Sequence, residues 1–195
     1  MSKTIALVMV DGPADWEYGP ILAAARGWFG IGIVSATQDG KPVTSIGGLS
    51  IVPQYAITDL DANQADLWIL PGSDAWREKA IPDTILSGLK TRVAAGRPVA
   101  GICGATVALA QAGLLDSRPH TSNSLQFLQE STPAYGGSAH YREQHSVSDG
   151  LVVSAPGTAP ISFAVECLRI LVPEQADGIA RFRAEFAREF AREFA

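Results

Sequence analysis

Short continuous apolar runs alternate with helix-like segments along most of the chain. Such runs are typical of strands that are buried on both faces of a parallel sheet. The segments between them have helical spacing, and the segment at 83–95 has Pro82 near its first turn and Gly96 just past its end. The pattern predicts strands at 4–10, 32–36, 66–70 and 98–102, and helices at 21–29, 83–95, 105–112, 125–129 and 159–171.

Two further stretches have the composition of β-hairpins. One covers residues 40–53 around Gly47-Gly48, and the other covers residues 145–154 around the turn Ser148-Asp149-Gly150. Alternating strands and helices predict an α/β fold, a flavodoxin-like three-layer sandwich whose sheet is mostly parallel. A chain of 195 residues is long enough for one such domain with a full core.

The C-terminal end of the chain repeats a four-residue unit that begins again at each Phe. We therefore divide the chain into an α/β domain, residues 1–173, and a helical extension, residues 174–195. On a helix, residues four apart stay on one side. We expect one helix over 176–195 whose apolar stripe packs on its own domain or on a neighbouring subunit. The stripe consists of Phe182, Phe186, Phe190 and Phe194.

Composition narrows the possible partners. The chain is 47% hydrophobic and 18% charged, with a formal net charge of −5, and it shows no basic patch, which argues against nucleic acid. No apolar run reaches 18 residues, so no membrane span is expected. The chain enters its first strand at once, and its two Cys make no disulfide framework, so we expect a cytoplasmic protein. No Cys or His spacing typical of zinc sites is present, and we expect no metal and no cofactor.

The stretch Arg97–Thr106, RPVAGICGAT, is the strongest candidate for chemistry. An apolar strand ends at Ile102, Cys103 follows at once, and small residues then open a helix. A nucleophile on such a tight turn is held with its side chain exposed. The helix N-terminus would favour thiolate and lower the thiol pKa. Cys167 lies within an apolar helix instead, where a free Cys is typically part of the packing.

A reactive thiol needs a proton acceptor and hydrogen-bond donors for the developing oxyanion. Asp15 and Glu17 follow the first strand, and ligands in parallel sheets bind at the carboxyl ends of strands. His120 is an alternative base, and it is preferred over His140 and His145 because we also expect a short strand just before it. The backbone N–H groups after Pro71-Gly72 and at Gly104 are candidate oxyanion donors, and we expect Asp15, Gly72 and Thr106 to contact substrate.

Taken together, these motifs resemble those of the ThiJ/PfpI family of the class I glutamine amidotransferase-like superfamily. The resemblance spans about residues 3–172. It rests on the first strand with Glu17 before Pro20, Leu70-Pro71-Gly72, the elbow from Ala100 to Thr106, Gly113-Leu-Leu-Asp116 and the strand at His120.

The resemblance implies that Cys103 is the reactive thiol, that Glu17 is its acidic partner, and that Ser73 and Gly104 supply the oxyanion donors. It places His120 where some members have a site His. Ser73 replaces the second Gly of the usual Pro-Gly-Gly, and Gly104 stands where the protease-like branch has His directly after the Cys. Isocyanide hydratases have Asp at the position of Glu17.

Described members include hydrolases, glyoxalases or deglycases, isocyanide hydratases, chaperones and oxidation sensors. The resemblance therefore implies a cofactor-independent cysteine enzyme, hydrolase- or glyoxalase-like, for a small carbonyl or amide-like substrate, and a homodimer. The alternative is a non-enzymatic redox sensor or chaperone in which Cys103 is oxidised to sulfinic acid. A ligand-binding domain with vestigial chemistry is a third possibility.

Overall fold

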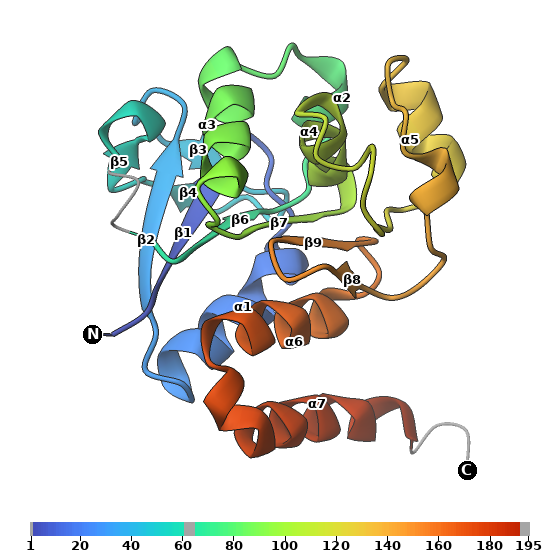
Figure 1. The fold of residues 1–195 in the computed structure, drawn as a ribbon. Coiled ribbons are helices and arrows are strands. Elements are labelled where there is room, and N and C mark those ends of the chain that lie inside the picture. The colour runs from blue at the N-terminus through green and yellow to red at the C-terminus, as the bar shows by residue number, and fades with distance from the viewer. Residues whose placement is uncertain (1, 61–64, 192–195) are drawn as a thin grey trace.

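A computed structural model describes residues 2–60 and 65–191 and contains a seven-stranded sheet, whose arrangement can be followed in Figure 1. All neighbouring strands in it are parallel except the edge pair, which is antiparallel. The predicted α/β fold is therefore confirmed. From edge to edge the strands are β5 (Tyr55–Ala56), β2 (Gly32–Thr37), β1 (Thr4–Met9), β6 (Leu67–Leu70), β7 (Val99–Ile102), β9 (Val152–Ala155) and β8 (Val147–Ser148).

Helices cover both faces of this sheet, as Figure 1 shows. One face carries α1 (Asp15–Gly27) and α6 (Pro160–Leu171), with α7 (Ala176–Ala191) packed on α6 from outside. The described helices include none that is long and apolar enough to cross a membrane. On the opposite face lie α2 (Ala75–Glu78), α3 (Asp83–Ala94), α4 (Thr106–Gln111) and α5 (Leu125–Ser131).

The sheet separates two hydrophobic cores, and the strand β1 contributes side chains to both. Successive side chains of a strand point to opposite faces, and here Ile5, Leu7 and Met9 join the core beneath α1 and α6. Ala6 and Val8 join the core beneath the helices of the other face. Burial on both faces explains why this strand is a continuous apolar run in the sequence.

Both predicted hairpins are confirmed. The first is a separate two-stranded sheet of β3 (Val43–Thr44) and β4 (Ser50–Ile51), paired antiparallel. The second pairs β8 with β9 across the predicted Asp-Gly turn. The short helix expected at 125–129 is also present as α5.

The start of the first helix was predicted wrongly. The sequence suggested that Pro20 opens a helix at Ile21, whereas α1 begins at Asp15 and contains Pro20. The N–H of Ala14 donates a hydrogen bond to the carbonyl of Gly72 at 2.9 Å, and this bond fixes the chain at the N-terminus of α1. The carboxylates of Asp15 and Glu17 stand in the first turn, where the helix dipole favours negative charge.

The C-terminal helix packs on its own chain. Phe182 is buried in the core beneath α1 and α6, and its ring meets the ring of Trp28 edge-on at 5.7 Å. Phe186 is 38% exposed. The helix is described to Ala191, and the predicted contributions of Phe190 and Phe194 lie outside the described side chains.

Candidate active site around Cys103

Cys103 occupies a strained turn between β7 and α4. Its φ of +57° is unique among the non-glycine residues that the structure describes. L-residues rarely adopt this region, and such strain persists where surrounding structure enforces it, often at functional sites. A 3-10 turn, Cys103–Ala105, leads into α4. The geometry is that of a nucleophile elbow.

The hydroxyl of Thr106 supports this elbow. It donates to the carbonyl of Cys103 at 2.6 Å and lies 2.6 Å from the hydroxyl of Ser122. Because the single hydroxyl proton of Thr106 is used on Cys103, Ser122 is the donor in the second bond. Thr106 is fully buried, so it holds the strained backbone and presents no surface to a substrate.

Glu17 projects from the first turn of α1 to the sulfur of Cys103. The side chain is fully buried, and Oε2 accepts the N–H of Gly72 at 2.5 Å. Oε1 has no nitrogen or oxygen partner among the described residues and faces the thiol. A buried oxygen without a partner is costly, and a proton on Oε1 shared with the sulfur removes that cost.

The two acids of this pair affect each other. Burial raises the pKa of Glu17 to about 7, against the opposing hydrogen bond from Gly72. Burial, and after it the charge of Glu17, raises the pKa of the Cys103 thiol to about 11. The sequence suggested a lowered thiol pKa. That expectation was wrong for this structure, because desolvation outweighs the hydrogen bonds from Asn123 and Gly104.

Sequence reasoning missed two residues at the sulfur. The amide Nδ2 of Asn123 donates to Sγ of Cys103 at 3.3 Å, and its Oδ1 accepts the N–H of Gly157 at 3.0 Å. A Cβ on Gly157 would lie 2.9 Å from both Sγ of Cys103 and Oε1 of Glu17, so only glycine fits. Asn123 belongs to a polar run, His120–Asn123, and that run was the only available signal.

The candidate oxyanion donors lie next to each other. A Cβ on Gly104 would lie 2.5 Å from the carbonyl oxygen of Ser73 and 3.2 Å from its nitrogen. The hydroxyl of Ser73 donates to the carbonyl of Asp11 at 2.5 Å, which turns this side chain toward the backbone after β1. Gly72 is similarly constrained, since a Cβ there would lie 2.7 Å from Cβ of Cys103.

His120 and Asp15 have other partners in the structure. The ring of His120 is fully buried, with Nδ1 at 2.8 Å from the carbonyl of Arg118 and Nε2 bonded to the hydroxyl of Tyr135. Burial lowers the pKa of His120. The carboxylate of Asp15 accepts the N–H of Gly47 at 2.7 Å and thereby ties α1 to the β3–β4 hairpin. Neither side chain has a hydrogen bond to Cys103 among those described.

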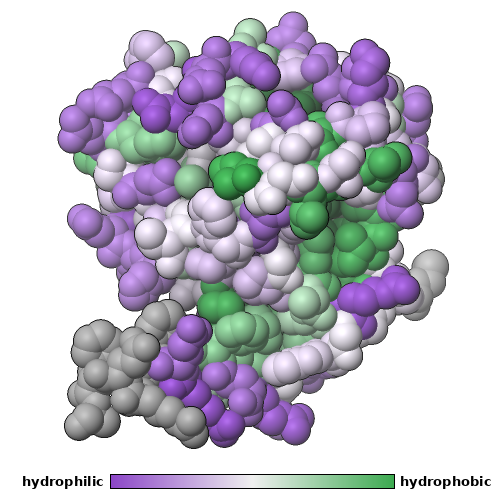
Figure 2. Space-filling model, turned by 180° about the vertical axis from the view of Figure 1, so that it is seen from behind, coloured by the Kyte–Doolittle hydropathy of each residue, from purple (hydrophilic) through white to green (hydrophobic). Residues whose placement is uncertain are grey.

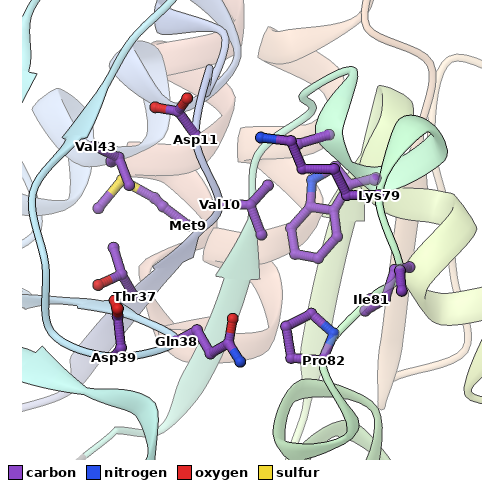
Figure 3. Close-up of a pocket in the computed structure, with 13 residues that line it drawn as sticks. Met9, Val10, Asp11, Thr37, Gln38, Asp39, Val43, Lys79, Ile81 and Pro82 are labelled. Carbon is purple, nitrogen blue, oxygen red and sulfur yellow. The ribbon is translucent and has the colours of Figure 1, made fainter.

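A cavity of about 200 Å³ lies at the carboxyl ends of β1 and β2, and Cys103 does not line it (Figure 3). Figure 3 shows Asp11 and Asp39 around it, with the stem of Lys79 along one side. The bond from Ser73 to the carbonyl of Asp11 connects its wall to the Cys103 site. Across the described residues, no group of three acidic, His or Cys side chains could hold a metal ion.

The fold and this elbow define a class of protein, and comparison with known proteins identifies the family. The chain belongs to the DJ-1/PfpI family, whose sequence profile matches residues 3–170. A DJ-1 superfamily protein from Agrobacterium tumefaciens, Atu0886, has a similar crystal structure. Its TM-score is 0.84 at 41% identity, over 94% of this chain and 99% of that one.

Two Bacillus proteins are also similar. The Bacillus subtilis protein called uncharacterized protease YoaZ is 36% identical over 177 residues, which cover 87% of this chain and 84% of that protein. The thiJ/pfpI family protein from Bacillus anthracis has a crystal structure with a TM-score of 0.79 at 34% identity, over 87% of this chain and 84% of that one. Similarity thus extends over most of the length of these two proteins.

The two cysteines should differ in reactivity. Cys103 is half-buried at the elbow, whereas Cys167 is fully buried inside α6, where burial raises its thiol pKa well above the usual value. Brief treatment of the native protein with iodoacetamide, followed by peptide mass mapping, should modify Cys103 first. Preferential labelling of Cys167 would contradict this assignment.

Proposed function

We propose that this protein is a cofactor-independent cysteine hydrolase that acts on a small carbonyl or amide-like substrate. The observation that carries the proposal is the strained Cys103 held against the buried carboxyl of Glu17. The relatives called uncharacterized proteases support hydrolysis as the reaction class. We favour a small substrate over a polypeptide for two reasons. Gly104 stands where the protease-like branch has a His directly after the thiol, and both ring nitrogens of His120 are already engaged.

In this proposal Sγ of Cys103 attacks the carbonyl carbon, and the thiol proton passes to the ionised carboxylate of Glu17, the form that prevails above its pKa of about 7. The electron pair of the C=O bond moves to oxygen, and the N–H groups of Ser73 and Gly104 donate hydrogen bonds to the negative charge that develops there. Glu17 then gives the proton to the leaving group as its bond to carbon breaks. Water attacks the resulting thioester, releases the acid product and returns the proton to sulfur. Asn123 holds Sγ in position through its amide.

Turnover on a panel of small esters, amides, aldehydes and nitriles tests the proposal. We expect product formation with the wild type and with Cys167→Ser, and none above background with Cys103→Ser. Cys167 is the matched control because it is the other free thiol and is fully buried within α6. Equal rates for wild type and Cys103→Ser on every substrate would refute a cysteine hydrolase.

One observation supports redox sensing as a second candidate function. Within the part of the chain that the structure describes, Oε1 of Glu17 has no nitrogen or oxygen partner, and it faces Sγ, where a protonated carboxyl could donate to an oxidised sulfur. Two molecules of hydrogen peroxide would then each transfer one oxygen atom to the sulfur of Cys103, as the O–O bond breaks and water leaves. Intact mass after mild peroxide treatment distinguishes this function: a gain of two oxygens at Cys103 without turnover on the panel favours it.

A further inference from the structure

A large cleft lies between α1, α6 and α7, and the proposed chemistry does not use it. Its volume is about 760 Å³, within the usual range for sites of small organic ligands. Figure 2 shows apolar surface above the charged residues of α7 on this side of the molecule. The apolar part of the lining includes Trp16, Pro20, Ala159, Ile161, Phe186 and Ala187.

A smaller polar recess of about 180 Å³ adjoins this cleft. The two cavities share His145, Ser162 and Arg183 in their walls. The recess adds Arg169, whose guanidinium is already paired with Glu166 at 2.5 Å. Arg183, by contrast, forms no ion pair with any side chain that the structure describes. The recess therefore offers one unneutralised cation beside an apolar cleft.

Neither of the two carboxylates in the lining of the large cleft forms a described ion pair with Arg183. Asp15 is committed to the N–H of Gly47 and to the hydroxyl of Tyr18, at 2.7 and 3.0 Å. Glu189 lies six residues beyond Arg183 on α7, which is about 9 Å along the helix axis. Phe186 and Ala187 stand between them. Polarity thus changes along the cleft from cationic at Arg183 to apolar at Phe186 and Trp16.

We propose that this cleft binds an amphiphilic organic anion, a carboxylate with an aliphatic chain of medium length. The carboxylate lies at Arg183, with Ser162 and His145 as hydrogen-bond donors, and the chain lies between Trp16 and Phe186. Arginine suits carboxylates because its planar fork can donate two bonds at once. The site does not depend on the chemistry proposed at Cys103, because Cys103 does not line either cavity.

Binding of decanoate, used below its micellar concentration, tests the proposal on the full chain. Trp16 is 53% exposed and its Nε1 donates to the carbonyl of Gly157, so its fluorescence should change as the cleft fills. We expect saturable binding by calorimetry with one site per chain and a matching fluorescence change. Trp16→Phe should lose most of that change. Acetate, which lacks the chain, and decanol, which lacks the charge, should bind at least tenfold more weakly.

Matched variants separate the cleft from other surfaces. Arg183→Gln should weaken decanoate binding about tenfold or more, as the loss of a charge-assisted pair predicts. Arg188→Gln on the same helix should not, because Arg188 is paired with Glu185 at 2.9 Å and does not line the cleft. Cys103→Ala should bind like the wild type.

Several outcomes would overturn the proposal. Unsaturable binding, or equal affinity for decanol and decanoate, would show a nonspecific apolar surface. Loss of binding in Cys103→Ala would place the ligand at the thiol. A two-chain mass by light scattering that Phe186→Glu reduces to one chain would show that a second copy covers the cleft.

Discussion

A Glu17→Gln variant is expected to turn substrate over roughly 10² to 10⁴ times more slowly than the wild type, the usual contribution of general acid–base catalysis. Gln keeps the size of the side chain and can still accept the N–H of Gly72. It cannot take the thiol proton or return it to a leaving group. The measurement is kcat on any substrate that the panel identifies.

The same substitution should affect alkylation of Cys103 in the opposite direction. The pKa of Glu17 is raised to about 7, so its carboxyl is neutral below that pH and charged above it. Its charge contributes to the raised pKa of the thiol. Gln stays neutral, so the variant should form thiolate at lower pH and react faster with iodoacetamide above pH 7. Rates measured from pH 5 to 10 test this.

Asp15→Asn is the matched control for Glu17→Gln. Asp15 stands two residues earlier in the same helical turn, but its carboxylate bonds to the hairpin at Gly47 rather than to the thiol. Its alkylation profile should follow the wild type. If Glu17→Gln also reproduced the wild-type profile and turnover, Glu17 would have no role in proton transfer.

The sequence was most informative where burial imposes a pattern. The runs at β1, β6 and β7 are apolar because both faces of these strands are covered, and this pattern predicted the parallel sheet. The entrance of α1 was not predicted, because the bond from Ala14 to Gly72 joins segments far apart in the chain. Local signals such as Pro20 do not report such contacts.

The candidate site shows the same division between local and distant information. Cys103 could be found because its strand, turn and small neighbours are consecutive. Asn123 and Gly157 reach the sulfur from separate loops, and nothing in their own sequence specifies that approach. The direction of the thiol pKa shift depends on burial and on Glu17, so the helix dipole alone predicted it wrongly.

Phe182→Ala is expected to lower the free energy of unfolding by about 3–5 kcal/mol, the usual cost of removing a buried Phe side chain. The ring is 1% exposed and contacts Trp28 and Phe186 at centroid distances of 5.7 and 5.1 Å. For a chain of this size each 1 kcal/mol shifts Tm by about 2–4 °C. The variant should therefore melt at least about 6 °C below the wild type.

Phe186→Ala is the matched control, since it occupies the next repeat of the same helix but is 38% exposed. Its Tm should fall far less. Removal of residues 174–195 should lower Tm at least as much as Phe182→Ala, while the molecular mass per particle decreases only by the deleted segment, because the buried Phe packs on its own chain. A Phe182→Ala variant that melts within 2 °C of the wild type would show that α7 does not contribute to the core in solution.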